Sequence, residues 1–299
     1  MIQNAGIGGC PVLAFNLVEI AFNPYNQVMF KDYEKSVRLW HCDRLSEYDG
    51  ILNFVTTRHK GFSQEPYDTL NMGLSAGDNP LRVIRNRELV ASILGIEAGC
   101  FVSSWQEHGN SVRAITRESF ERETSYMKVP KEHADAMVTG LPNVCLTVII
   151  ADCTPVMFYD PKNNVIGIAH AGWRGTVGKI SAEVVTVLHD RFGCQPGDLV
   201  VGIGPSIGPE KYEVGPEVIT EAEKSFGTID GLIRIDKKSE KGYFDLWEAN
   251  RRQLIEAGVP ENQIEIAGIC TYSHPEQFFS YRYQGSKSGR MAAGIMLWE

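Results

Sequence analysis

The sequence IIADCTPVMFYDPKNNVIGIAHAGWRG, from Ile149 to Gly175, carries most of what this chain reveals about its fold. An apolar run ends at Cys153, and His170 follows after the length of a strand, a turn (DPKNN) and a returning strand. Apolar runs on either side of a turn predict an antiparallel hairpin. Because the two ends of such a hairpin are adjacent, the thiol of Cys153 and the imidazole of His170 are expected to meet at one edge of a sheet.

A second histidine, His108, lies upstream in the sequence WQEHG, just after the apolar run that begins at Cys100. A thiol with two imidazoles indicates either a metal site or a cysteine nucleophile with a histidine base. Zinc accepts these ligands and keeps a fourth position open in catalytic sites, and copper accepts the same donors. In the metal-free alternative, Cys153 is the nucleophile and His170 or His108 is its base. The spacing leaves both possibilities open.

Arg58 and Asn71 flank a loop rich in hydrogen-bonding groups, RHKGFSQEPYDTLNMG. Arg58 could hold a phosphate or a carboxylate through two parallel hydrogen bonds, or it could be a solvated loop arginine. The loop GIGPSIGP, which begins at Gly202, fits neither of the common glycine-rich phosphate-binding motifs. Since its prolines lack backbone N–H donors, we expect a rigid turn near the site.

Apolar and amphipathic segments together predict a protein with both strands and helices. Strands are expected at residues 51–57, 100–103, 144–150, 165–169, 199–203, 264–269 and 291–297. Helices are expected at residues 80–94, 172–192, 216–225 and 246–257, with Asn79 and Asp245 as N-terminal caps. The apolar runs 12–15 and 17–22 are compatible with edge strands. Because strands and helices alternate without a regular βαβ repeat, we expect an α/β protein with mixed sheets.

The composition argues against two classes of partner. A net charge of -8 and a pI near 5.5 disfavour binding to nucleic acid. The chain has no uninterrupted apolar run near the about 18 residues that a membrane-spanning helix needs. Its N-terminal apolar stretch lacks the basic start of a signal peptide. We therefore expect a cytoplasmic protein without a membrane or nucleic-acid partner, which is a monomer or a weak homodimer.

Several blocks of this sequence, in this order, resemble the YfiH-type family. Its members are described as multicopper polyphenol oxidase (laccase) domain proteins and as purine nucleoside phosphorylases. The resemblance runs from about Val55 to the C-terminus through the blocks TTRHKGFSQEPYDTLNMGL, GDNPLRVIRNRELV, WQEHGNSV, ADAMVT, ADCTPVMFYDP, AHAGWRGTVGKI, GIGPSIGPEKYEV, FDLWEANRRQL, CTY and FFSYR. It implies a single α/β domain of two mixed sheets sandwiched between helix layers. The implied catalytic domain covers residues 51–299, and residues 1–50 are expected to be an N-terminal extension packed on it.

The resemblance also implies roles for particular residues. His108, Cys153 and His170 match the metal-binding triad of the family, with zinc or copper as the cofactor, and are expected to be catalytic. Arg58 and Asn71 match polar positions of the family pocket, so both are expected to bind substrate and Arg58 to assist catalysis. Three positions depart from the family pattern and bear on specificity more than on the triad: Lys60, Glu107 and Tyr283.

The implied activity is the phosphorolysis of adenosine, inosine and methylthioadenosine to the free base and ribose 1-phosphate. Adenosine deamination is implied as a second activity, so the expected small-molecule partners are purine nucleosides and phosphate. The alternatives are a cysteine-type amidase or hydrolase acting on peptidoglycan precursors, a polyphenol oxidase (laccase), and a non-enzymatic metal- or ligand-binding protein.

Overall fold

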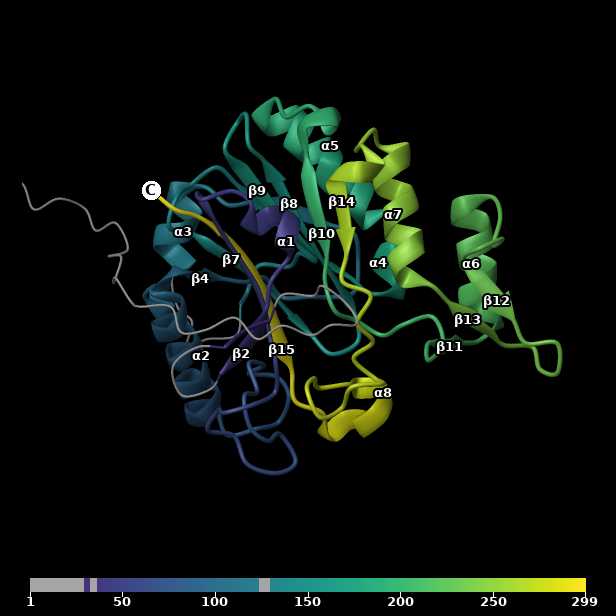
Figure 1. The fold of residues 1–299 in the computed structure, drawn as a ribbon, viewed down its shortest axis with the longest axis horizontal. Helices are drawn as coiled ribbons and strands as arrows, with labels where there is room; N and C mark the ends of the chain where they lie inside the picture. Colours follow the sequence, from purple (N-terminus) through teal and green to yellow (C-terminus); the bar gives the residue numbers. More distant parts are fainter. Residues whose placement is uncertain (1–29, 33–36, 124–129) are drawn as a thin grey trace, which may run out of the picture.

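Two six-stranded sheets form the centre of the computed structural model, which describes residues 30–32, 37–123 and 130–299 (Figure 1). The runs 12–15 and 17–22, expected to be edge strands, lie outside the described residues. The first sheet consists of β1 (Phe30–Asp32), β2 (Arg38–Trp40), β3 (Ile51–Thr56), β15 (Met291–Leu297), β7 (Cys145–Ile150) and β4 (Phe101–Val102), in that spatial order. Since β2 pairs with β3, this sheet continues across residue 51, the expected domain boundary.

The second sheet contains the predicted hairpin. Its strands, in spatial order, are β14 (Ile264–Ile266), β10 (Val200–Ile203), β8 (Thr154–Asp160), β9 (Val165–Ala171), β6 (Ala136–Thr139) and β5 (Val112–Ala114). β8 and β9 pair antiparallel along their whole length. The outer pairs, β10 with β14 and β5 with β6, are parallel, so this sheet is mixed. The first sheet is also mixed, because β4 pairs parallel with β7 while its other pairs are antiparallel.

The two sheets pack face to face, and one apolar cluster fills the space between them. Val148 of β7 and Ile295 of β15 enter this cluster from the first sheet. Met157 of β8 and Ile168 of β9 enter it from the second sheet. These side chains are at most 1% exposed. Burying an aliphatic side chain of this size contributes roughly 1.5–3 kcal/mol, so this interior is a main source of stability.

Helices cover the outer faces of the two sheets. α2 (Pro80–Leu94) packs on the first sheet, where Val90 joins a cluster with Phe54 and Phe101. α5 (Ile180–Phe192) and α7 (Leu246–Glu256) cover the second sheet, where Val184 and Leu254 pack on its strands. This arrangement confirms the predicted fold, a single α/β domain of two mixed sheets sandwiched between helix layers.

A third, smaller sheet was not predicted from the sequence. It consists of β11 (Glu213–Val214), β13 (Gly242–Phe244) and β12 (Ile233–Ile235), all antiparallel. It packs with α6 (Pro216–Phe226) and projects to one side of the two main sheets (Figure 1). Its strands are two or three residues long, too short for an alternating pattern to be recognised in the sequence.

Most predicted helices are present, but one is divided. Asn79 and Asp245 cap α2 and α7 through their side chains, as predicted. The prediction of a single helix at residues 172–192 is wrong, because this segment forms two separate helices, α4 (Trp173–Val177) and α5. Lys179 has a φ of 64°, a left-handed conformation that interrupts α-helical hydrogen bonding. The remaining helices with four or more residues are α1 (Asp43–Ser46), α3 (Arg117–Glu123) and α8 (Tyr281–Gln284).

The described helices include none that is both long enough and apolar enough to cross a membrane.

The turn that joins β8 to β9 is held by Asp160, whose side chain is buried. Its Oδ1 accepts the backbone N–H groups of Lys162 (2.8 Å) and Asn163 (3.1 Å), and its Oδ2 accepts Nδ2 of Asn163 (2.8 Å). These bonds close the hairpin at the end opposite to Cys153 and His170.

Replacing Asp160 with alanine is expected to lower the free energy of unfolding by roughly 1–3 kcal/mol, because three hydrogen bonds that hold the turn lose their acceptor. Asp160→Asn keeps an oxygen at this position and serves as the matched control, with a smaller loss. Urea denaturation followed by circular dichroism measures both. An alanine variant as stable as the wild type would contradict this role of Asp160.

Candidate metal and substrate site

The hairpin brings Cys153 and His170 to the same end of the second sheet. His170 of β9 lies opposite Pro155 of β8, and Cys153 directly precedes β8. His108 reaches them from the loop after β4, and its ring centre lies 4.9 Å from that of His170. One ligand atom from each of these three residues lies within 4.8 Å of the other two. We call Cys153, His108 and His170 the triad.

Two glycines allow the backbone to approach the triad closely. A Cβ atom at Gly172 would lie 3.0 Å from Sγ of Cys153 and 3.2 Å from a ring carbon of His108. A Cβ atom at Gly175 would lie 2.7 Å from the carbonyl oxygen of Gly109. The small residues of the block HAGWRG are therefore required for the segment after β9 to pass beside the triad.

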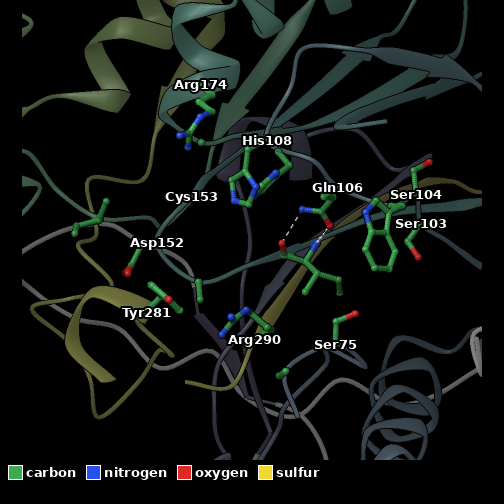
Figure 2. A pocket seen from close by; sticks show the side chains of 18 of the residues that line it. Ser75, Ser103, Ser104, Gln106, His108, Asp152, Cys153, Arg174, Tyr281 and Arg290 are labelled. Carbon is green, nitrogen blue, oxygen red and sulfur yellow. Dashed lines mark hydrogen bonds between the residues drawn. The ribbon is translucent and has the colours of Figure 1, made fainter. Parts of the chain in front are cut away.

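Gln106 attaches the His108 loop to the first sheet. Its Nε2 donates to the carbonyl oxygen of Ile149, and its Oε1 accepts the N–H of the same residue, both at 2.8 Å (Figure 2). The amide side chain thus imitates a neighbouring strand at the exposed edge of β7. This pair of bonds fixes the loop two residues before His108.

Asp135 connects two members of the triad. Its carboxylate lies 2.8 Å from Nδ1 of His170, which leaves Nε2 of that ring available to the site. The same carboxylate accepts the backbone N–H groups of Glu107, His108 and Gly109 at 3.0, 3.0 and 2.7 Å. These bonds hold His108 in a left-handed conformation with a φ of 63°, which a non-glycine residue rarely adopts. Asp135 therefore orients both imidazoles.

The electrostatics of the triad favour a charged pair. Burial opposes ionisation of Cys153, but the imidazoles of His170 and His108 outweigh it and lower the pKa of the thiol to about 6. Burial also opposes protonation of His170, but the Cys153 thiolate and the Asp135 carboxylate outweigh it and raise the pKa of the ring to about 9. Without a metal, the two groups are a thiolate and an imidazolium at neutral pH.

A thiolate with two imidazole nitrogens is a donor set that suits a zinc or copper ion. Such an ion would take the place of the proton on His170. The triad and the hydrogen bond from His170 to Asp135 match the usual arrangement of a zinc ligand supported by a carboxylate.

The triad lies in a cavity of about 700 Å³, which is large enough for a nucleoside-sized ligand. The wall comes from both main sheets, from the loop at residues 73–76, from α4 and from α8. Four arginines line it: Arg87, Arg174, Arg282 and Arg290. Arg87 is buried and donates to the carbonyl oxygen of Met72, so the other three remain for a ligand.

Asp152 is the acidic residue among those that line the cavity, and it holds α8 in place. Its carboxylate accepts the hydroxyl of Thr271 at 2.7 Å and the backbone N–H of Arg282 at 2.6 Å. Burial raises the pKa of this carboxyl group. The bond to Arg282 holds the backbone of α8, and the bond to Thr271 holds the segment after β14. Asp152 therefore determines where the side chains of α8 lie relative to Cys153.

Arg58, which was expected to contact substrate, does not line the cavity. Its Nε and Nη2 donate to the carbonyl oxygen of Asp68, and its Nη1 donates to that of Pro275. Its guanidinium also lies 4.7 Å from the centre of the Phe279 ring. These contacts join two loops, so the structure assigns Arg58 a position in the scaffold and not in the pocket.

Asn71 is also absent from the cavity wall and is fully buried. Its Oδ1 accepts the backbone N–H groups of Gly73 and Arg290 at 3.1 and 2.9 Å. Gly73 and Arg290 do line the cavity, so Asn71 acts on the wall through the backbone of its neighbours.

The sequence analysis did not single out Asp135, Gln106 or the pocket arginines. Asp135, Gln106, Arg87, Arg174 and Arg282 lie within the blocks ADAMVT, WQEHG, GDNPLRVIRNRELV, HAGWRG and FFSYR, and Arg290 lies just before β15. An isolated acidic or amide residue resembles a surface residue in sequence. The hydrogen bonds that give these side chains their roles become visible only when the loops are placed in space.

We predict that Asp135→Asn weakens metal binding roughly 10- to 100-fold, because His170 loses the charged partner that orients it. Competition with a chromogenic chelator measures the affinity for zinc. The control is Asp230→Asn, which changes an exposed carboxylate outside the cavity. Equal zinc affinity in Asp135→Asn and the wild type would disprove this role.

The low pKa of Cys153 predicts a specific pH profile for its alkylation. In chelator-treated protein, the rate of reaction with iodoacetamide should rise with a midpoint near pH 6, because the thiolate is the reactive form. Mass spectrometry of the peptides follows the reaction. Cys145 is the internal control, since burial raises the pKa of its thiol and shields it. A midpoint above pH 8 at Cys153 would contradict the charged pair.

Comparison with known proteins places these features in a family. The family model described as multi-copper polyphenol oxidoreductase laccase matches residues 52–298. A purine nucleoside phosphorylase of Bacteroides thetaiotaomicron is 36% identical, over 88% of this chain and 97% of that protein. Adenosine deaminase RL5, from an unknown prokaryotic organism, is 32% identical, over 87% of this chain and 98% of that protein.

A solved structure gives the same result for the fold. The crystal structure of the hypothetical protein YfiH of Bacillus licheniformis superimposes with a TM-score of 0.81 at 33% identity. That match covers 87% of this chain and 96% of the other. Since both sequence and structure agree over nearly the whole described domain, the chain belongs to the YfiH-type family, the family of multi-copper polyphenol oxidoreductase laccase domains.

Proposed function

We propose that this protein is a zinc-dependent purine nucleoside phosphorylase with adenosine deaminase activity. The observation that carries the proposal is the cavity that combines a thiolate, two imidazoles and three available arginines. The names of relatives over 30% identical across most of both chains, purine nucleoside phosphorylase and adenosine deaminase, support it. In this proposal residues 51–299 are the catalytic domain and residues 1–50 an N-terminal extension.

Phosphorolysis needs a place for phosphate, and the arginines supply it. In the reaction an oxygen of phosphate bonds to C1′ of the ribose, while the bond from C1′ to the purine nitrogen breaks. Arg174 donates no hydrogen bond to any residue that the structure describes, so its guanidinium is available to a ligand. Arg282 and Arg290 each donate through Nη1 to backbone carbonyl oxygens, which fixes their orientation. Guanidinium groups held in this way bind phosphate oxygens in pairs.

His108, Cys153 and His170 would hold the zinc ion. Bound zinc supplies Lewis-acid chemistry, which serves the removal of the amino group from adenosine. Asp135 keeps Nδ1 of His170 engaged, so that only Nε2 faces the site. Inosine and methylthioadenosine are proposed as further substrates, because the cavity is large enough for purine nucleosides with an altered base or 5′ group.

A cysteine-type hydrolase acting on peptidoglycan precursors is the second candidate. It is favoured by the low pKa of Cys153 and by the imidazolium of His170 beside it, the pair that a cysteine nucleophile requires. This candidate predicts that the metal-free protein is active and that alkylation of Cys153 abolishes the activity. The phosphorylase proposal predicts that chelation abolishes it. Oxidation of a phenol by dioxygen would instead indicate the laccase activity of the family description.

The decisive experiment incubates the purified protein with adenosine, with and without phosphate, and separates the products by chromatography. We expect adenine only when phosphate is present, and inosine in both samples. Cys153→Ala is expected to reduce both products at least roughly 1000-fold, because the site loses its thiolate ligand. His274→Ala, at an exposed histidine outside the cavity, is the control. Full turnover by Cys153→Ala, or no product from the wild type, would refute the proposed function.

A further inference from the structure

The aromatic rings of the cavity fall into two classes. Three rings each carry the guanidinium of one of the available arginines. The distances from the guanidinium carbon to the ring centre are 4.2 Å for Arg174 on Trp173, 5.1 Å for Arg282 on Tyr212 and 5.4 Å for Arg290 on Tyr281. These rings hold the arginines in position and are therefore occupied by them.

Trp105 belongs to the other class. It lines the cavity, its side chain is 41% exposed, and no arginine or lysine of the described chain lies over its ring. An indole buries about 150–250 Å² when it is packed, so leaving this area in contact with water is unfavourable. An exposed ring on a surface needs no explanation, but this ring lies in the wall of a cavity three residues from a triad histidine.

The position of Trp105 is fixed before any ligand binds. Its backbone N–H donates to the carbonyl oxygen of Glu132 at 2.7 Å, and its carbonyl oxygen accepts the N–H of Ala134 at 3.1 Å. Its ring packs against the imidazole of His133, with ring centres 6.2 Å apart. His133 is in turn held by Glu107 at 2.7 Å. A rigid aromatic ring binds a flat ligand with little loss of conformational entropy.

The small hydroxyl side chains of the cavity and Arg174 lie on different sides of the triad. Ser75, Ser103 and Ser104 lie on one side of His108, and the chain places Trp105 directly after Ser104 (Figure 2). Arg174 and Tyr281 lie on the other side, and Arg290 lies below the triad, between Tyr281 and Ser75 (Figure 2). The end of the cavity with small hydroxyl side chains and an indole is therefore neutral, and we call the part around Arg174, Arg282 and Arg290 the cationic end.

We infer that Trp105 is the stacking surface for the purine base and that the cationic end takes the phosphate. This inference rests on the proposed function and adds the orientation of the substrate to it. The nucleoside then lies across the triad, with its base at the neutral end and its ribose directed toward the arginines. Because a stacking surface recognises a flat ring and not a particular edge, adenine and hypoxanthine both fit. A pyrimidine covers less of the indole and binds more weakly.

The test compares Trp105→Ala and Trp105→Phe with the wild type, using adenosine, uridine and inorganic phosphate as ligands. Trp105→Ala should raise the KM for adenosine roughly 10- to 100-fold while kcat and the KM for phosphate change little. Trp105→Phe keeps an aromatic ring and should restore the KM for adenosine to within about fivefold of the wild type. Zinc content is measured in each variant.

Fluorescence provides a second readout that does not depend on turnover. Stacking of adenosine should quench the tryptophan emission of the wild type and of the control Trp298→Phe, whose tryptophan lies outside the cavity. The quenching should be clearly smaller in Trp105→Phe, and what remains there reports on Trp173, which also lines the cavity. If Trp105→Ala loses zinc, this comparison decides the question, because Trp105→Phe retains the packing of the loop.

The possible failures are distinguishable. If the wild type binds adenosine and Trp105→Ala binds it equally well, or if Trp105→Phe is quenched as strongly as the wild type, the stacking role is wrong and the proposed function stands. If the wild type neither binds nor converts adenosine, both fail together. Equal affinity of the wild type for uridine and adenosine would also overturn the stacking role.

Discussion

The site depends on the hydrogen bonds that the buried carboxylate of Asp135 forms with His170 and with the His108 loop. Burying a carboxylate away from water raises the free energy of the folded state unless hydrogen bonds replace its hydration. Here the imidazole of His170 and three successive backbone N–H groups provide that replacement, and they lower the pKa of Asp135 against the effect of burial. Since those groups come from the His108 loop and from β9, the same bonds bring two triad members together.

The two-sheet architecture explains how Asp135 comes to this place. Asp135 directly precedes β6, which pairs with β9, and the N–H of His170 donates to the carbonyl oxygen of Asp135 at 2.7 Å. The backbone ladder therefore aligns these residues before their side chains interact. Gln106 performs the equivalent task at the first sheet, through its bonds to Ile149 of β7. The site lies where loops from both sheets converge, and each sheet contributes one attachment for the His108 loop.

The charge of the cavity differs from that of the whole protein. The chain has a net charge of -8, yet its cavity is lined by four arginines and one aspartate. A local positive field in a cleft attracts anions irrespective of the total charge. Aromatic rings hold three of the arginines over a common space, while Trp105 remains uncovered. The net charge of the chain thus bears on nucleic-acid binding, whereas the arrangement of arginines in the cavity bears on the substrate.

Local patterns in the sequence were sufficient for most strands of the two main sheets, the principal helices, the hairpin and the three triad residues, but not for β5 and β6. Apolar periodicity, the caps Asn79 and Asp245 and the DPKNN turn act over a few residues, so their effects are readable without the fold. The division of the helix at Lys179 and the short third sheet were missed because they depend on single backbone conformations and on neighbouring elements.

The tertiary structure alone decided which polar residues belong to the site. Arg58 and Asn71 looked suitable in sequence, but neither lines the cavity: Arg58 joins two loops, and Asn71 holds the backbone of two wall residues, Gly73 and Arg290. Asp135 and Trp105 lie within blocks of the family resemblance but were not singled out in the sequence, because their roles come from partners on other segments. A side chain's chemistry is determined by its type, but its access to substrate is determined by the packing of distant segments around it, and a single sequence does not contain those distances in readable form.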